Sequence, residues 1–206
     1  PGPLLCTALM GAAAIVKAGS DEQCENILPG IAGGERLLAL ACDESPRHAP
    51  HKVDTRAEID GQSYRINGRK VNVADGHFAD TFFVSAKTPG GVSLFLVPSD
   101  AGGVTVESYR VLDTHFAANV TFNQVKVTDQ HLLGPLNGGI KILDYILDVA
   151  RAGASAELLG IAQEVFERTI QYLKERKQFG VPIGSFQALQ HRAAHLFSEI
   201  EMCKSL

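Results

Sequence analysis

Residues 176–190 place two cationic side chains beside a predicted break between two helices. The stretch reads RKQFGVPIGSFQALQ, so Arg176 and Lys177 stand just before Gly180. A guanidinium can donate two parallel hydrogen bonds to the oxygens of an anion, so Arg176 is a candidate for anion binding. Two cations at the end of a helix also interact favourably with the helix dipole, so a simple helix cap is the alternative.

Asp148 and Arg151 form a second candidate pair, three residues apart in a stretch expected to be helical. Side chains three residues apart lie on the same face of a helix, and an ordinary surface ion pair would have this spacing. A contact with a charged ligand is the competing interpretation. The spacing fits both.

Two histidines raise the question of a metal site. His191 and His195 could present two imidazoles from one helix face, and Glu199 continues that face. The helix rises about 12 Å from the first of these residues to the last, so all three cannot bind one ion. The glutamate of an HExxH motif is missing as well. We therefore predict no metal site.

The composition narrows the class of protein. The 206 residues are 45% hydrophobic and carry a net charge of −4, and the basic residues are scattered, so we expect no nucleic-acid partner. The longest apolar run near the start, Ala8 to Val16, is too short to span a bilayer. We expect no membrane association and a cytoplasmic location. Four cysteines without a CxxC spacing are expected to be reduced structural thiols.

Helices and β-strands must position these candidate binding residues. Residues 1–34 are expected to be helical, with an N-cap at Ser20. From 35 to 135 the chain has short β-branched and aromatic runs, which predict an antiparallel, barrel-like β-domain. The runs are bounded by turn signals at Asp60-Gly61, Asn67-Gly68 and Pro89-Gly90-Gly91.

After Gly134 and Pro135 the apolar period becomes helical. The stripe runs from Ile142 to Leu173 without an interrupting proline, which predicts one helix of more than thirty residues, and a second helix starts near Ser185. Such long amphipathic helices need partners, so we interpret 136–206 as two antiparallel helices of an incomplete four-helix bundle. The predicted fold class is α+β and multidomain, with ranges 1–34, 35–135 and 136–206.

Four stretches together resemble acyl-CoA dehydrogenases. Residues 176–190 are similar to the family signature R-x-Q/T-F-G-x-x-I/L followed by F/H-Q, and residues 152–163 resemble the small-residue helix before it. Asn67-Gly68-Arg69-Lys70 is similar to the family's N-G-x-K hairpin, and residues 122–127 to its F-x-x-V-x-V strand. The resemblance covers nearly the whole chain and implies the end of an N-terminal helical domain, a middle β-domain and two helices of a C-terminal bundle, as a fragment of a longer protein.

The resemblance implies an FAD-dependent α,β-desaturation of an acyl-CoA thioester. In the family, the signature residues reach the FAD of a neighbouring subunit, and the aspartate and arginine of D-x-x-R approach the coenzyme A part of the substrate. A homo- or hetero-oligomer, dimer or tetramer, and an electron-transfer flavoprotein as a possible acceptor follow from the same resemblance. The corresponding positions are Arg176, Gln178, Phe179 and Gln187 for FAD, and Asp148 and Arg151 for the substrate.

The sequence departs from the family where the flavin ring is contacted. The family pattern W/F-I/V-T/S becomes Asn72-Val73-Ala74, so the aromatic and the hydroxyl are absent, although the three positions remain cofactor-binding candidates. The family's A-x-T-E-P-x-x-G-S-D becomes the segment 41–48, without the glycine-serine pair. A short basic run follows, with Arg47, His48, His51 and Lys52, which either meets coenzyme A phosphates or is a solvated loop.

A catalytic base is missing from this chain. The family places its glutamate either far downstream of the signature or immediately before the arginine of D-x-x-R, and the latter position is Ala150. We therefore predict no catalytic residue here. Two alternatives stay open beside the dehydrogenase: a non-catalytic partner subunit of a heteromeric enzyme, and a flavin monooxygenase or oxidase of the same fold.

Overall fold

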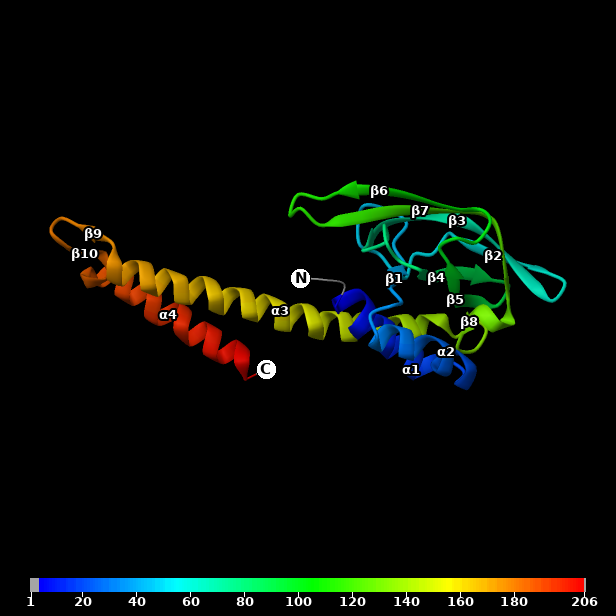
Figure 1. Cartoon of the computed structure of the whole chain (residues 1–206), viewed down its shortest axis with the longest axis horizontal. Helices are drawn as coiled ribbons and strands as arrows, with labels where there is room; N and C mark the ends of the chain where they lie inside the picture. The colour runs from blue at the N-terminus through cyan, green and yellow to red at the C-terminus, as the bar shows by residue number, and fades with distance from the viewer. Residues whose placement is uncertain (1–3, 206) are drawn as a thin grey trace. The chain divides into compact units, whose positions relative to one another are not determined.

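The computed structural model describes residues 4–205, which form two compact units, one ending at Ala150 and one starting at Arg151 (Figure 1). Helix α3 (Gly139–Glu175) contributes its first turns to the first unit and the remaining turns to the second. Residues 1–3 and 206, the outermost parts of the predicted terminal ranges, lie outside the described residues. The three predicted domain ranges stay predictions.

The first unit is built on an eight-stranded sheet with the order β6-β7-β3-β2-β4-β5-β8, and β1 pairs with β4. The strands are β1 (Leu38–Ala41), β2 (Arg56–Asp60), β3 (Ser63–Ala74), β4 (Thr81–Thr88), β5 (Gly91–Pro98), β6 (Val104–Arg110), β7 (Phe116–Thr128) and β8 (Leu132–Leu133). The predicted turns after Asp60 and at Pro89 are confirmed, because they connect β2 to β3 and β4 to β5.

The α+β class is confirmed, but the sheet is not purely antiparallel. Strands β1 and β2 both pair with β4 in parallel, while the remaining pairs are antiparallel. Parallel neighbours need a long connection between them, and the chain provides it because β2 and β3 intervene before β4. The order ends at β6 and β8, so the sheet of the described residues is open.

Strand β4 separates two apolar cores. Phe82 and Val84 pack into a core enclosed by the curved sheet, together with Ile66, Phe95 and other inward side chains. Phe83, on the opposite face of β4, packs into a second core against the helices. Because successive side chains of a strand point to opposite faces, an uninterrupted apolar run suits a strand buried on both faces.

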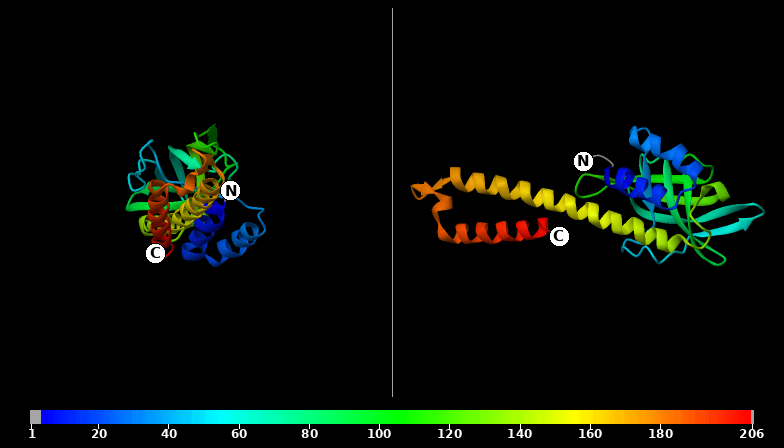
Figure 2. Two further views of the ribbon diagram at one scale, coloured as in Figure 1. Left: turned by 90° about the vertical axis from the view of Figure 1, so that its left-hand side faces the viewer. Right: turned by 90° about the horizontal axis from the view of Figure 1, so that it is seen from below.

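The helices of the first unit cover one face of the sheet (Figures 1 and 2). They are a π-helix (Leu4–Gly11), α1 (Ala12–Ala18), α2 (Asp21–Ala32) and the first turns of α3, and a 3-10 turn (Asp129–His131) precedes β8. The predicted cap at Ser20 is confirmed, because Gln23 N donates to Ser20 Oγ over 3.2 Å and Ser20 N donates to Gln23 Oε1 over 3.0 Å. This reciprocal pair is a capping box.

The second unit consists of two helices joined by a small hairpin. The prediction of a helix longer than thirty residues is confirmed, since α3 has 37 residues. The hairpin of β9 (Lys177–Gln178) and β10 (Val181–Pro182) leads through a 3-10 turn (Ile183–Ser185) into α4 (Gln187–Lys204). The hairpin was not predicted, because strands of two residues produce no periodic pattern.

The prediction of a turn at Asn67-Gly68 is wrong, because both residues lie inside β3. The pairing of β3 with β7 shifts its register there, which makes the pair a β-bulge. Asn67 Oδ1 accepts a hydrogen bond of 2.8 Å from Gln124 N on β7, which replaces a regular ladder bond. An Asn-Gly dipeptide serves a bulge as readily as a turn because both need unusual backbone angles.

Candidate functional site

The hairpin between α3 and α4 holds three of the predicted cofactor residues together. Arg176 and Gln178 lie on its first arm and Phe179 at its tip. A hydrogen bond of 2.8 Å from Ile183 N to Arg176 O closes the base of the hairpin. Gln187 is the first residue of α4, directly after the hairpin and its 3-10 turn.

Phe179 is the most unusual residue of this hairpin. It has φ 53, a left-handed conformation that bulky residues rarely adopt, and its side chain is 91% exposed. The ring of Phe186 lies 6.2 Å away in an edge-on arrangement. Arg176 is exposed too, and none of the residues from 4 to 205 forms an ion pair with its guanidinium. The hairpin therefore presents an aromatic face and an unneutralised cation to its surroundings.

The end of β3 carries the other predicted cofactor residues. Asn72 has φ 53 at a second bulge, between Lys70 and Val73, and the Tyr109 hydroxyl on β6 donates to Asn72 Oδ1. Val73 is 1% exposed because its side chain belongs to the core within the sheet, so only its backbone could touch a ligand. Ala74 is exposed and offers a methyl group.

The segment after β1 forms a loop that two carboxylates organise. Asp43 accepts hydrogen bonds from His48 Nδ1 and Ala49 N over 2.7 and 2.8 Å. Glu44 accepts the amides of Asp54 and Thr55, so it closes the far end of the same loop. This loop carries the basic run.

One histidine of the basic run contacts α3 instead of pointing away from the protein. His51 Nε2 lies 2.6 Å from Asp144 Oδ1. Both side chains are more than half exposed, so the pair contributes little to the free energy of unfolding. The contact shows that the loop is folded against the first unit.

Asp148 and Arg151 are both exposed on α3, and both take part in interactions. Ala150, between them, is partly buried and packs against the core beneath the helices. Its methyl group cannot accept a proton. Both charged residues lie within α3, as the sequence predicts.

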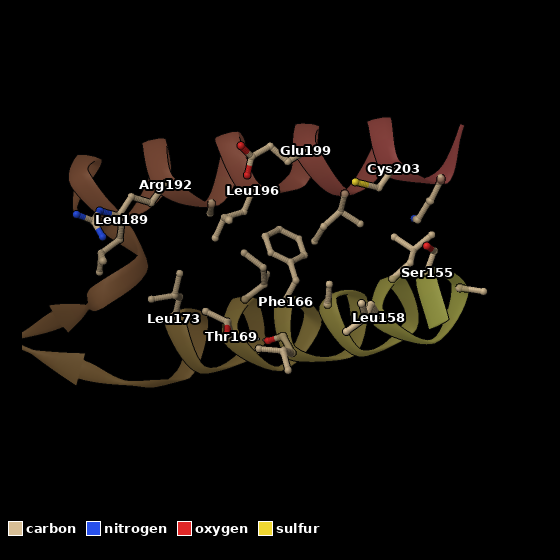
Figure 3. A pocket seen from close by; sticks show the side chains of 18 of the residues that line it. Ser155, Leu158, Phe166, Thr169, Leu173, Leu189, Arg192, Leu196, Glu199 and Cys203 are labelled. Carbon is tan, nitrogen blue, oxygen red and sulfur yellow. Dashed lines mark hydrogen bonds between the residues drawn. The ribbon is translucent and has the colours of Figure 1, made fainter. Parts of the chain in front are cut away.

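The facing sides of α3 and α4 form an apolar groove of about 1240 Å³ (Figure 3). Phe166 lies between the two helices and faces Leu196 in this view. Large apolar side chains of the stripe remain exposed: Leu158, Ile161, Val165 and Phe197. The amphipathic pattern predicted for both helices therefore exists, and the described residues leave it uncovered.

The histidines of α4 are exposed on the helix surface. His195 Nδ1 lies 3.6 Å from Glu199 Oε1, a helical i,i+4 contact. No cluster of three or more potential metal ligands occurs within residues 4–205. In the same range, no helix is both long and apolar enough to cross a bilayer.

Sequence reasoning missed one buried group in this region. Lys70 entered only as the last letter of a motif, yet its ammonium is completely buried and bonded to Glu44. A lysine in an otherwise alternating strand was the available signal, because a buried lysine requires a partner.

Comparison with known proteins agrees with this geometry. The family model "Acyl-CoA dehydrogenase, middle domain" matches residues 45–125, and "Acyl-CoA dehydrogenase, C-terminal domain" matches residues 137–206. The short/branched chain specific acyl-CoA dehydrogenase of Bos taurus mitochondria is 34% identical over 200 residues, which is 93% of this chain and 46% of that protein. The chain thus spans about half the length of the curated relatives that it matches.

Solved structures give the same result. The Tcur3481-Tcur3483 steroid ACAD is 38% identical with a TM-score of 0.85, over 98% of this chain and 53% of that one. A glutaryl-CoA dehydrogenase from Mycobacterium smegmatis, in complex with FADH2, is 28% identical with a TM-score of 0.89, over 95% of this chain and 52% of that one. The two family models together cover most of the chain and the relatives match nearly all of it, so the chain belongs to the acyl-CoA dehydrogenase family.

Proposed function

We propose that the protein carrying this chain catalyses FAD-dependent α,β-desaturation of an acyl-CoA thioester. The observation that carries the proposal is the hairpin, where an exposed aromatic held in a left-handed conformation stands beside an unneutralised guanidinium. Strained backbone at an exposed aromatic is typical of a binding site, because packing within the chain gains nothing from it. A relative solved with FADH2 supports the choice of cofactor.

FAD supplies the hydride acceptor for such a reaction when it is bound. Arg176 would hold pyrophosphate oxygens through its guanidinium, and Gln178, Phe179 and Gln187 would line the adenosine half. Since an exposed hairpin points away from its own chain, we propose that these residues serve the cofactor of a neighbouring subunit. The donor set of the hairpin fits this role, because it offers a cation, amides and an aromatic face.

The chain's own residues would position the thioester without removing its proton. We propose that Asp148 and Arg151 approach the coenzyme A part of the substrate from α3. Ala150 cannot act as a base, so we propose that the α-proton goes to a carboxylate at another position of the assembled protein. An electron-transfer flavoprotein as acceptor, an oligomeric state and a cytoplasmic location complete the proposal.

The experiment uses the absorption spectrum of the purified full-length protein. A panel of acyl-CoA thioesters is added without oxygen while the flavin band at about 450 nm is followed. Bleaching of bound flavin by one thioester is the expected result. Bound flavin that no thioester bleaches would contradict desaturation, and a colourless protein that takes up no added FAD would leave the second candidate.

The second candidate is a non-catalytic subunit whose hairpin completes the FAD site of a different chain. The end of β3 favours it, because Asn72 is engaged by Tyr109 and Ala74 has no hydroxyl to offer a flavin ring. Its test is co-purification. A yellow complex containing a second polypeptide, with no flavin on this chain alone, would establish it.

A further inference from the structure

Lys70 is one of the largest side chains that are completely buried in the first unit, and its ammonium uses all three of its donors. Nζ lies 2.7 Å from Glu44 Oε1, 2.9 Å from Ser85 Oγ and 3.3 Å from Cys42 O. These acceptors come from the loop after β1 and from β4, whereas Lys70 lies on β3. One buried cation thus connects three separate segments.

Glu44 extends the connection to the start of β2. Its carboxylate accepts the amide of Asp54 over 2.7 Å and the amide of Thr55 over 3.0 Å, in addition to Lys70. Burial alone would raise the pKa of Glu44, but the hydrogen bonds from Lys70 and Thr55 outweigh it and lower the pKa. The carboxylate is therefore ionised at neutral pH and pairs with the buried ammonium.

The hydrogen bonds of Lys70 and Glu44 lie next to an interruption in the pairing of β3 with β7. The pairing of β3 with β7 is interrupted between Lys70 and Val73, so residues 71 and 72 have no ladder partner on β7. Val71 N donates instead to Asp43 O over 2.8 Å, next to Glu44 in the loop. The position of residues 71 and 72 therefore depends on their attachment to segment 42–44, whereas Val73 and Ala74 are paired with β7 again.

Lys70 is completely buried and Glu44 is partly buried, and an ion pair in such surroundings is a poor source of stability. Taking both charges out of water offsets most of their attraction, and replacing both by neutral groups is often harmless to folding. Such a pair can instead select one arrangement among several. Here the arrangement that it selects is the alignment of segment 42–44 with the end of β3.

We propose that Lys70 and Glu44 are positioning residues, which hold segments 42–44 and 71–74 together as one wall for the flavin ring. This inference rests on the proposed function, because the same two segments match the family's flavin-contacting stretches. With a small residue at position 74 and Asn72 turned toward Tyr109, backbone groups must hold the ring, and their placement depends on this network.

The test is the double variant Glu44→Gln/Lys70→Met in the full-length assembly as purified. Both charges disappear together, so neither is left buried and unpaired, and the glutamine still accepts a backbone amide. The matched control is Tyr64→Phe on the same strand, which removes a partly buried hydrogen bond of 3.0 Å to Asp129. Tyr64 lies six residues away along β3, about 20 Å.

Three measurements decide the matter: melting temperature, Kd for FAD, and amide hydrogen exchange of residues 43–55 and 71–75 without cofactor. We expect the double variant to melt near the wild-type temperature, to bind FAD at least tenfold more weakly, and to exchange faster in both segments. The control should keep wild-type FAD affinity and wild-type exchange there.

Several outcomes would overturn the inference. A double variant that binds FAD within twofold of wild type would do so. The inference would also fail if the double variant and the Tyr64→Phe control both lost FAD affinity in proportion to their loss of melting temperature. If the double variant does not fold, Ser85→Ala decides, since it removes one acceptor and should weaken FAD binding about threefold. Wild-type protein that binds no FAD at all would instead refute the proposed function. Loss of FAD binding in the double variant alone would leave the proposed function intact.

Discussion

At the scale of single residues, the chain separates groups that can hold a cofactor from groups that can do acid-base chemistry. Arg176 and Phe179 are exposed and available, whereas the position before Arg151 carries the methyl group of Ala150. Under the proposed function, cofactor binding and proton transfer would therefore depend on different parts of the protein. A substitution in the hairpin should affect the first and leave the second unchanged.

Arg176→Ala should weaken FAD binding roughly tenfold to a hundredfold, because hydrogen bonds to charged groups contribute about 1.5–3 kcal/mol each. The melting temperature of the cofactor-free protein should stay unchanged, since the side chain is exposed and forms no ion pair among the described residues. Fluorescence titration with FAD measures the effect. Arg168→Ala is the control, because it also removes an exposed arginine from this region. Equal weakening in both variants would refute a specific role for Arg176.

At the scale of elements, β3 concentrates the irregular geometry. It contains both bulges, and at the first one Thr55 packs directly on Gly68. A Cβ added at Gly68, which has φ 156, would lie 2.4 Å from Thr55 Oγ1 and 2.7 Å from its Cα. The glycine therefore lets the strand and the start of β2 approach closely.

Gly68→Ala should lower the free energy of unfolding by about 1–3 kcal/mol, because the added methyl group forces the backbone of Thr55 away. Gly102→Ala is the matched control, since a Cβ there would meet nothing within 4 Å. Urea denaturation followed by circular dichroism measures both. A Gly68 variant as stable as the control would show that the two segments do not touch in solution.

The long elements could be predicted from sequence, and the irregular ones could not. The stripe from Ile142 to Leu173 is enough to define α3, because packing on one face repeats with the helix period. The bulges, the parallel pairing of β1 and the two-residue strands at 177–182 depend on tertiary contacts.

The candidate site divides in the same way. Arg176 and Phe179 were found by their spacing in the signature, and the structure brings them onto one hairpin. The pairing of Lys70 with Glu44 joins residues 26 positions apart, and no local pattern contains it.

At the scale of the whole molecule, the hairpin and the end of β3 need not serve the same cofactor. If the hairpin completes a neighbour's site, each FAD is held by two chains. Defects in the two regions should then complement each other when chains are mixed. An assembly in which every chain is self-sufficient would not behave in this way.

Mixing Arg176→Ala chains with Glu44→Gln/Lys70→Met chains tests this arrangement. Each parent should bind FAD weakly. After unfolding and refolding together, a fraction of the sites combines an intact hairpin with an intact β3, so tight FAD binding should partly return. Flavin absorbance after gel filtration measures the recovery, and wild-type chains refolded alone give the reference. Mixtures that bind FAD no better than their parents would indicate that the hairpin and the end of β3 of one chain hold the same FAD.

The left-handed conformation of Phe179 has a consequence for attempts to improve the protein in the laboratory. A non-glycine residue with this φ is strained by roughly 1–2 kcal/mol, and asparagine or glycine would relieve the strain. Selection for heat resistance alone should therefore favour replacement of this phenylalanine. Under the proposed function, variants chosen in that way would be more stable but would bind FAD more weakly, so such a selection should also follow flavin absorbance.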